Sequence, residues 1–196
     1  MPRSASTLSL VADIGGTNTR CALADGRKVL QDTVRRFSNA DFPGLETVLK
    51  TYLADQGGVC PTAACVAVAG PVRDGAATMT NLDWTVDRDT LMRATQAKTV
   101  AILNDLQAQG HALGNISKDH LQTIRLGALS GSHAAQLMLG VGTGMNAALV
   151  YRTDHGTLVP PSESGHVTLP ILTEEEIRLQ SYLARKHGLP GAEDVL

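Results

Sequence analysis

The sequence predicts an α/β protein with a mixed sheet, arranged as two lobes of which the second is incomplete. Residues 8–34 carry apolar runs separated by glycine-containing turn signals, which indicates three antiparallel strands. Residues 43–113 then alternate between helical spacing of apolar residues and short apolar runs, which predicts helices alternating with strands. Residues 136–152 repeat the opening pattern of strand, glycine turn and strand.

The first lobe has the predicted order βββαβαβα. We expect strands at 8–13, 19–24 and 28–34, a helix at 43–56, a strand at 63–69, a loop at 70–81, a helix at 87–96, a strand at 99–103 and a helix at 106–113. Three meandering strands followed by alternating helices and strands are similar to the ribonuclease H-like lobe of the actin and sugar-kinase superfamily. This inference is an analogy of topology.

The second lobe begins the same scheme and does not complete it. We expect strands at 136–141 and 146–152, a further strand near Leu158 and a helix at 174–186, with Thr173 and Glu176 spaced as a capping box. The elements that follow this point in the first lobe are missing before Leu196. The predicted domains are therefore a small N-terminal lobe at 1–112 and a partial large lobe at 113–196.

Composition excludes several classes of protein. The net charge is −2 with both signs interspersed, so no basic surface is available for nucleic acid. The apolar run after Arg3 is too short for a signal peptide or a spanning helix, and we expect a cytoplasmic protein without a membrane partner. Cys21, Cys60 and Cys65 lack CxxC spacing, which argues against a metal site built on cysteine.

A glycine turn between the first two strands is the strongest chemical signal. It comprises Asp13, Ile14, Gly15, Gly16, Thr17 and Asn18. Adjacent glycines let the backbone bend tightly and turn its N–H groups toward an anion, and Asp13 can hold a metal-bound water. The alternative is an ordinary hairpin turn. The turn is not a P-loop, because no Lys-Ser/Thr pair follows it.

A second glycine turn, formed by Gly142, Thr143 and Gly144, follows the strand at 136–141. Its threonine hydroxyl could reach a phosphate oxygen, although an ordinary hairpin turn explains the same residues. Two such turns from two similarly built lobes would grip one polyphosphate between them. The pair is therefore more specific than either turn alone.

Two further groups carry candidate chemistry. Asn104 and Asp105 follow an apolar strand where a helix begins, a place from which α/β sheets present reactive groups. A carboxylate there can act as general base in phosphoryl transfer, or it can simply cap the helix. Glu163 and His166 share one loop and can bracket vicinal hydroxyls, although most such loop residues are only solvated.

Six motifs in order resemble the bacterial glucokinase family along nearly the whole chain. They are Asp13–Arg20, Val68–Val72, Met79–Trp84, Leu103–Asp105, Gly142–Gly144 and Glu163–His166. The resemblance implies that Asp105 is the base for the sugar 6-hydroxyl and that Asn104 binds the sugar beside it. It also implies sugar contacts from Asn81, Glu163, His166 and Glu193. The two glycine turns would hold the ATP phosphates, with Asp13 acting weakly through a water on Mg²⁺.

The sequence departs from the family pattern at three places. Met145-Asn146 stands where many relatives have Leu-Gly, and Ser164 replaces a glycine of the loop that carries Glu163 and His166. The third departure is the part beyond Leu196, which in the family completes the large lobe and supplies the adenine pocket. A full-length gene containing this chain is therefore expected.

The expected function is ATP-dependent phosphorylation of glucose at its 6-hydroxyl, with Mg²⁺, in the cytoplasm. The alternatives are a sugar-binding fragment or regulatory protein without kinase activity, and a kinase for another hexose or for acetate. A repressor is disfavoured, because no helix-turn-helix region precedes Asp13 and no cysteine-rich zinc motif follows His166. Glucose is the expected partner, and a homodimer is left open.

Overall fold

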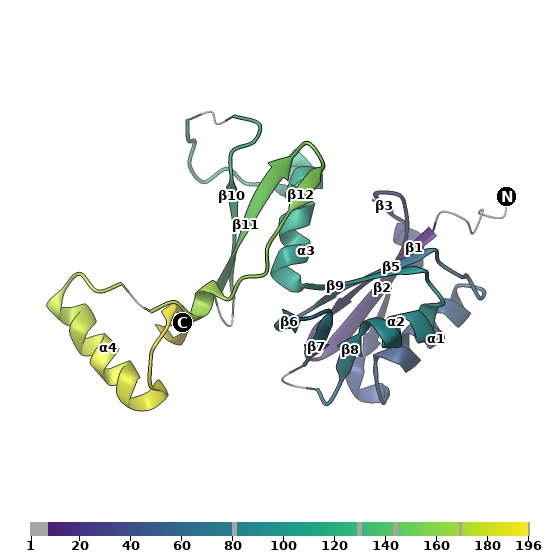
Figure 1. Ribbon diagram of the computed structural model, residues 1–196, viewed down its shortest axis with the longest axis horizontal. Coiled ribbons are helices and arrows are strands. Elements are labelled where there is room, and N and C mark those ends of the chain that lie inside the picture. The colour runs from purple at the N-terminus through teal and green to yellow at the C-terminus, as the bar shows by residue number, and fades with distance from the viewer. Residues whose placement is uncertain (1–7, 80–81, 129–130, 143–144, 169, 196) are drawn as a thin grey trace. The chain divides into compact units, whose positions relative to one another are not determined.

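The computed structural model describes residues 8–79, 82–128, 131–142, 145–168 and 170–195, without the side chains of residues 192 and 193. The chain forms two compact units, Met1–Asp105 and Leu106–Leu196. The sequence predicted a boundary after residue 112, whereas the two units divide after Asp105, the first residue of the helix α3 (Asp105–Ala112). Figure 1 shows the elements of both units.

The first unit is built on a mixed sheet, as predicted. It contains β1 (Leu8–Ile14), β2 (Asn18–Asp25), β3 (Lys28–Val29), β4 (Arg35–Ser38), β5 (Ala63–Val68) and β9 (Thr99–Asn104). The order is β3-β2-β1-β5-β9, and β4 also pairs with β2. Strand β1 runs antiparallel to β2 and parallel to β5, which in turn runs parallel to β9.

Two helices, α1 (Leu45–Asp55) and α2 (Arg88–Thr95), lie side by side and share a core with this sheet (Figure 1). Alternate residues of β1 and β5 are buried, as expected for strands whose one face packs against helices. The largest fully buried side chains of the unit include Leu10, Leu49, Tyr52, Val66 and Leu91. Burial of these apolar surfaces is the main stabilising contribution of the unit.

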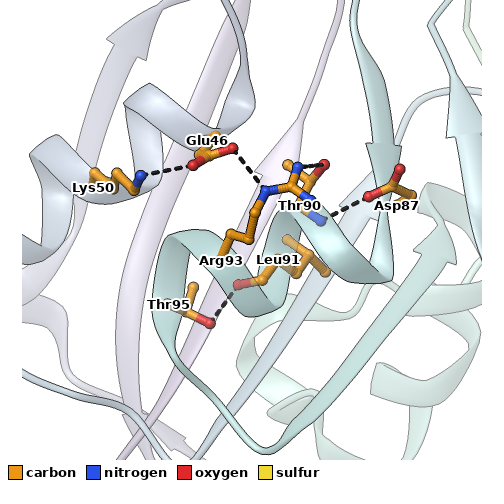
Figure 2. Close-up of polar contacts among 7 residues, drawn as sticks. All are labelled: Glu46, Lys50, Asp87, Thr90, Leu91, Arg93 and Thr95. Carbon is orange, nitrogen blue, oxygen red and sulfur yellow. Dashed lines mark hydrogen bonds and ion pairs between the residues drawn. The ribbon is translucent and has the colours of Figure 1, made fainter.

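A chain of polar contacts on the surface joins α1 to α2 (Figure 2). The Glu46 carboxylate accepts hydrogen bonds from Lys50 Nζ at 2.6 Å and from Arg93 Nε at 3.4 Å. These two donors lower the pKa of Glu46, and the hydrogen bond from Lys50 has the largest effect.

Asp87 caps α2 by accepting the Thr90 N–H at 2.7 Å, and this backbone hydrogen bond lowers the pKa of Asp87. The cap begins the second helix where the sequence predicted one.

The predicted third strand at 28–34 is wrong in its length. Strand β3 ends at Val29, a 3-10 turn follows at Gln31–Thr33, and β4 then returns to β2. Thr33 explains the break, because its hydroxyl accepts the Leu23 N–H at 3.0 Å and donates to the Leu30 carbonyl at 2.6 Å. A side chain that bonds to nearby backbone competes with the regular strand ladder.

The predicted loop at 70–81 is also wrong in part. It contains β6 (Val72–Arg73) and β7 (Ala76–Thr78), which form a small antiparallel sheet with β8 (Thr85–Asp87). The turn between β6 and β7 consists of Asp74 and Gly75, both with positive φ. An Asp-Gly pair between short strands is a strong hairpin signal, which the sequence reading overlooked.

The second unit has a small core between α3 and an antiparallel sheet of β10 (Gln136–Val141), β11 (Met145–Thr153) and β12 (Gly156–Leu158). Leu106, Ala148, Val150 and Val159 are its buried members. Helix α4 (Glu174–His187) starts with the predicted capping box, because Thr173 Oγ1 accepts the Glu176 N–H and the Glu176 carboxylate accepts the Thr173 N–H. No helix among the described residues has the length and apolar character to cross a membrane.

Candidate active site

Three parallel strands of the first unit end at one edge of the sheet. In the pairing register, Ile14 of β1 lies beside Val68 of β5, and Val68 lies beside Asn104 of β9. The segments that follow these residues, the glycine turn, Ala69-Gly70 and Asp105, therefore leave the sheet at the same edge. Ligands of open α/β sheets bind at the carboxyl ends of their strands. The sequence motifs after all three strands thus share one location.

The glycine turn is held from behind by Asn39. Its side-chain Nδ2 donates to the Gly15 carbonyl at 2.8 Å, and its backbone N–H donates to the Thr17 carbonyl at 2.9 Å. The Asn39 Oδ1 accepts the hydroxyl of Thr19 at 2.8 Å, which fixes the orientation of the amide. Asn39 is 1% exposed and Thr19 is 0% exposed. Buried polar groups with satisfied hydrogen bonds give such a turn one conformation.

Gly15 contributes in another way than the sequence suggested. Its φ is not positive, and its N–H donates to the Asn18 carbonyl at 2.9 Å, so this N–H closes the turn. A Cβ built on Gly15 would lie 3.5 Å from that same carbonyl oxygen, an ordinary contact. The left-handed conformation that favours glycine is therefore not used here. Gly15 is one of the residues that line the pocket beside the turn.

That pocket has a volume of about 280 Å³ and is lined by Asp13, Gly15, Thr17, Asn18, Arg20 and Arg36. Arg20 lies opposite Asp13 on β1 and opposite Arg36 on β4. Within the described part of the chain, neither Arg20 nor Arg36 takes part in an ion pair. Two like charges on directly opposite residues are unfavourable, and an anion in the pocket would offset their repulsion.

Asn104 and Asp105 lie at the end of β9 and the beginning of α3. Asn104 is only 8% exposed, and its Nδ2 donates to the Gly70 carbonyl at 3.0 Å. This hydrogen bond ties the end of β9 to the segment that follows the neighbouring strand β5. Asp105 is half-buried as the first residue of the helix, so the structure presents its carboxylate from a rigid element.

In the second unit, Glu163 and His166 lie at either end of a loop whose middle is buried. Glu163 and His166 are exposed, whereas Gly165 between them is buried. The loop is fastened to the start of β11 by the side chain of Asn146, which donates to the Ser162 carbonyl and accepts the Ser164 N–H, both at 2.9 Å. The fold thus holds the backbone and leaves both candidate side chains accessible.

A second segment packs directly on this loop. Gly191 pairs with Thr168 in an isolated β-bridge, and a Cβ built on Gly191 would lie 2.6 Å from the Gly165 carbonyl oxygen. The Gly191 N–H donates to the Asp194 carboxylate at 2.7 Å, which begins the 3-10 turn Ala192–Val195. The backbone that carries Glu193 is thereby brought against the loop that carries Glu163 and His166.

The structure gathers the candidate residues into two groups, one in each unit. The first holds Asp13, Gly15, Thr17 and Asn18 at the pocket, with Asn104 and Asp105 at the same sheet edge. The second holds Glu163 and His166 in one loop, and Gly142 of the same unit is exposed directly after β10. Asn81, Thr143, Gly144 and the side chain of Glu193 lie outside the described residues.

Sequence reasoning missed Asn39, Arg36 and Asn146 as members of the site. Asn39 and Arg36 reach the glycine turn only because β4 pairs with β2, a strand that the sequence reading did not resolve. Asn146 departs from the residue that the family resemblance implies, but no local pattern in the sequence reveals its hydrogen-bond partners.

Among the described residues, no group of three or more His, Cys, Asp or Glu side chains could hold a metal ion by itself. Of the three cysteines, Cys21 is buried, and burial raises the pKa of its thiol to about 12. Asp13 offers one carboxylate in a pocket that also has hydroxyl and amide groups. That donor set fits Mg²⁺, which in nucleotide sites takes one or two carboxylates together with waters and phosphate oxygens.

Comparison with known proteins relates the chain to glucokinases. Residues 10–196 match the family model for glucokinase. A glucokinase of Caulobacter sp. is 36% identical over 194 residues, which cover 96% of this chain and 58% of that protein. A glucokinase of Saccharophagus degradans is 33% identical over 187 residues, which cover 94% of this chain and 58% of that protein.

One solved structure supports the same relation and the predicted fold class. The crystal structure of a glucokinase from an Antarctic psychrotroph matches with a TM-score of 0.80 at 31% identity, covering 96% of this chain and 60% of that one. A ribonuclease H-like, actin and sugar-kinase type fold is thereby confirmed for the part present. The chain spans 58% of the length of the two curated relatives, and the remainder of their length has no counterpart in the sequence described.

Proposed function

Because the chain belongs to the glucokinase family, we propose that the protein containing it transfers a phosphoryl group from ATP to the 6-hydroxyl of glucose. The observation that supports this proposal most is the common sheet edge of Ile14, Val68 and Asn104, which collects three of the family motifs in one place.

We place the reaction in the cytoplasm, where it would supply glucose 6-phosphate to glycolysis. A homodimer stays an expectation, to be tested by the mass of the protein in solution.

Asp105 acts in this proposal as the general base. A hydroxyl is a weak nucleophile, and a carboxylate within hydrogen-bonding reach accepts its proton as the bond to phosphorus forms. Asn104 positions the sugar beside Asp105, and its bond to the Gly70 carbonyl keeps its own amide in place. Asn81, Glu163, His166 and Glu193 hold the remaining hydroxyls, and the bidentate capacity of carboxylates suits vicinal diols.

The glycine turn Asp13–Asn18 and the turn Gly142–Gly144 hold the ATP phosphates. Arg20 and Arg36 supply positive charge at the first of these turns, where they line the pocket with Thr17 and Asn18. Asp13 would hold Mg²⁺ through a water, and the ion would neutralise charge on the phosphates. The carboxylate of Asp13 thus orients the nucleotide, while the turn excludes water from one side of the phosphates.

The experiment that tests the proposal couples formation of glucose 6-phosphate to a dye-linked dehydrogenase, with ATP and glucose as substrates. Asp105→Asn should lower kcat by about 100-fold to 10,000-fold while leaving the calorimetric Kd for glucose within about threefold. Asp55→Asn, an exposed acidic residue on α1, is the matched control and should behave as the parent protein. Full activity of Asp105→Asn would remove Asp105 as the base.

A further inference from the structure

Asn146 holds the backbone on both sides of Glu163. Its Nδ2 donates to the Ser162 carbonyl at 2.9 Å, and its Oδ1 accepts the Ser164 N–H at 2.9 Å. The same Oδ1 accepts the N–H of Ala147 at 2.8 Å. One amide side chain at the start of β11 therefore brackets a residue that is 17 positions further along the chain.

Ser164 completes the attachment. Its hydroxyl lies 2.7 Å from the hydroxyl of Ser162 and donates to the Ala147 carbonyl at 3.4 Å. Asn146, Ser162 and Ser164 are all half-buried, whereas Glu163 is exposed. The loop is thus fixed through its backbone and serines, and the carboxylate of Glu163 is left to project outward from a fixed Cα.

The resemblance to the family described above implies glycine in many relatives at the positions of Asn146 and Ser164. Glycine has no side chain that could make any of these hydrogen bonds, and its backbone loses more conformational freedom when it is ordered. The two departures are bonded to one another in the structure, since Asn146 Oδ1 accepts the Ser164 N–H. They therefore act as one unit.

We propose that Asn146, paired with Ser164, is a positioning residue for sugar binding, which sets the place of Glu163 and His166 before the sugar arrives. This inference rests on the proposed function, because it takes Glu163 and His166 as sugar ligands. Preorganised side chains bind more tightly than side chains that must be ordered on binding. Asn146 itself does not contact the sugar in this proposal.

The test measures KM for glucose, KM for ATP and kcat in the protein that contains this chain. Asn146→Ala removes all three hydrogen bonds and should raise KM for glucose by about tenfold, since the net stabilisation of each bond is modest. KM for ATP and kcat should change by less than about twofold, because the side-chain hydrogen bonds of Asn146 go to Ser162, Ser164 and Ala147 and not to the first glycine turn or to Asp105. A uniform loss of stability would not separate the two Michaelis constants in this way.

A second variant and a control keep the result interpretable. Asn146→Asp keeps an acceptor for the Ser164 N–H but places a second acceptor against the Ser162 carbonyl in place of the donor, so its KM for glucose should also rise above that of the parent. If Asn146→Ala does not fold, KM for glucose is measured in Asn146→Asp instead. Asn115→Ala, at an exposed asparagine of the same unit, should match the parent. Amide hydrogen exchange at Ser164, Gly165 and His166 should speed up in Asn146→Ala alone.

The outcomes separate the two proposals. An active parent together with an unchanged KM for glucose in Asn146→Ala would overturn the positioning role and leave the function standing. If the parent transferred no phosphate to glucose, the proposed function would fall and the positioning role with it. A raised KM for glucose with faster exchange at the loop, absent in Asn115→Ala, supports the inference.

Discussion

The side-chain amide of Asn39 donates a hydrogen bond of 2.8 Å to the carbonyl oxygen of Gly15, although 24 positions separate the two residues in the sequence. Thr19 orients this amide from the other side by donating its hydroxyl to the Asn39 Oδ1. The glycine turn that borders the pocket is therefore held by the side chain of Asn39. Asn39 directly follows β4 and begins the short 3-10 turn Asn39–Asp41. The geometry of the turn depends on this tertiary contact.

Replacing Asn39 should weaken both the fold and nucleotide binding. Asn39→Ala leaves the Gly15 carbonyl and the Thr19 hydroxyl without a buried partner, which should lower the free energy of unfolding by about 2–4 kcal/mol. The urea midpoint measures this loss, and KM for ATP should rise at a temperature where the variant is folded. Asn115→Ala serves as an exposed control. An unchanged urea midpoint for Asn39→Ala would show that the turn does not need this amide.

Arg36 should contribute to nucleotide affinity through charge. Arg36→Gln keeps a polar side chain and removes the cation that lines the pocket, so KM for ATP should rise by about threefold to tenfold. The difference from the parent should shrink as salt rises from 0.05 to about 0.5 M, because salt screens exposed charges. Arg27→Gln, at an exposed arginine in the turn after β2, is the matched control. Equal KM values for both variants would remove Arg36 from the site.

Gly191 should not tolerate a side chain. A Cβ there would lie 2.6 Å from the Gly165 carbonyl oxygen and 3.0 Å from His166 Cα, and both neighbours are backbone atoms. Gly191→Ala should therefore displace the loop and destabilise the second unit by about 1–3 kcal/mol. KM for glucose should rise together with the loss of thermal stability. Gly127→Ala, where nothing lies within 4 Å, should leave both unchanged.

The cap of α2 should make stability depend on pH in the acid range. The Thr90 N–H lowers the pKa of Asp87 below its ordinary value of 3.8, so the carboxylate contributes stability that is present above that value and is lost as pH falls through the lowered one. Asp87→Ala should cost about 1 kcal/mol at pH 7 and less at pH 2. Asp89→Ala, which is not the cap, controls for charge. Equal costs at both pH values would contradict the role of the ionised cap.

Much of the first unit could be predicted from the sequence, because its elements are local patterns. The run of apolar residues in β1, β5 and β9 and the helical spacing in α1 are properties of short segments, and the structure confirms each element. The extent of β3 and the small sheet of β6, β7 and β8 were predicted wrongly. In the first case the hydroxyl of Thr33 bonds to the backbone of Leu23, ten positions earlier, and no local pattern reports that contact.

The candidate site, like the fold, could be predicted from the sequence only in part. The residue types of the glycine turn, the strand-end pair Asn104-Asp105 and the loop with Glu163 and His166 were visible as motifs, because each motif occupies a few adjacent positions. The partners that hold these motifs were not visible, since Asn39, Asn146 and Gly191 lie 16 to 26 positions away from the residues that they contact. The motifs in the sequence were enough to predict which side chains are proposed to carry the chemistry. The amides that hold these motifs, and the glycine that lets two backbone segments approach closely, became visible only in the folded structure, because hydrogen bonding and close packing depend on distances that folding creates.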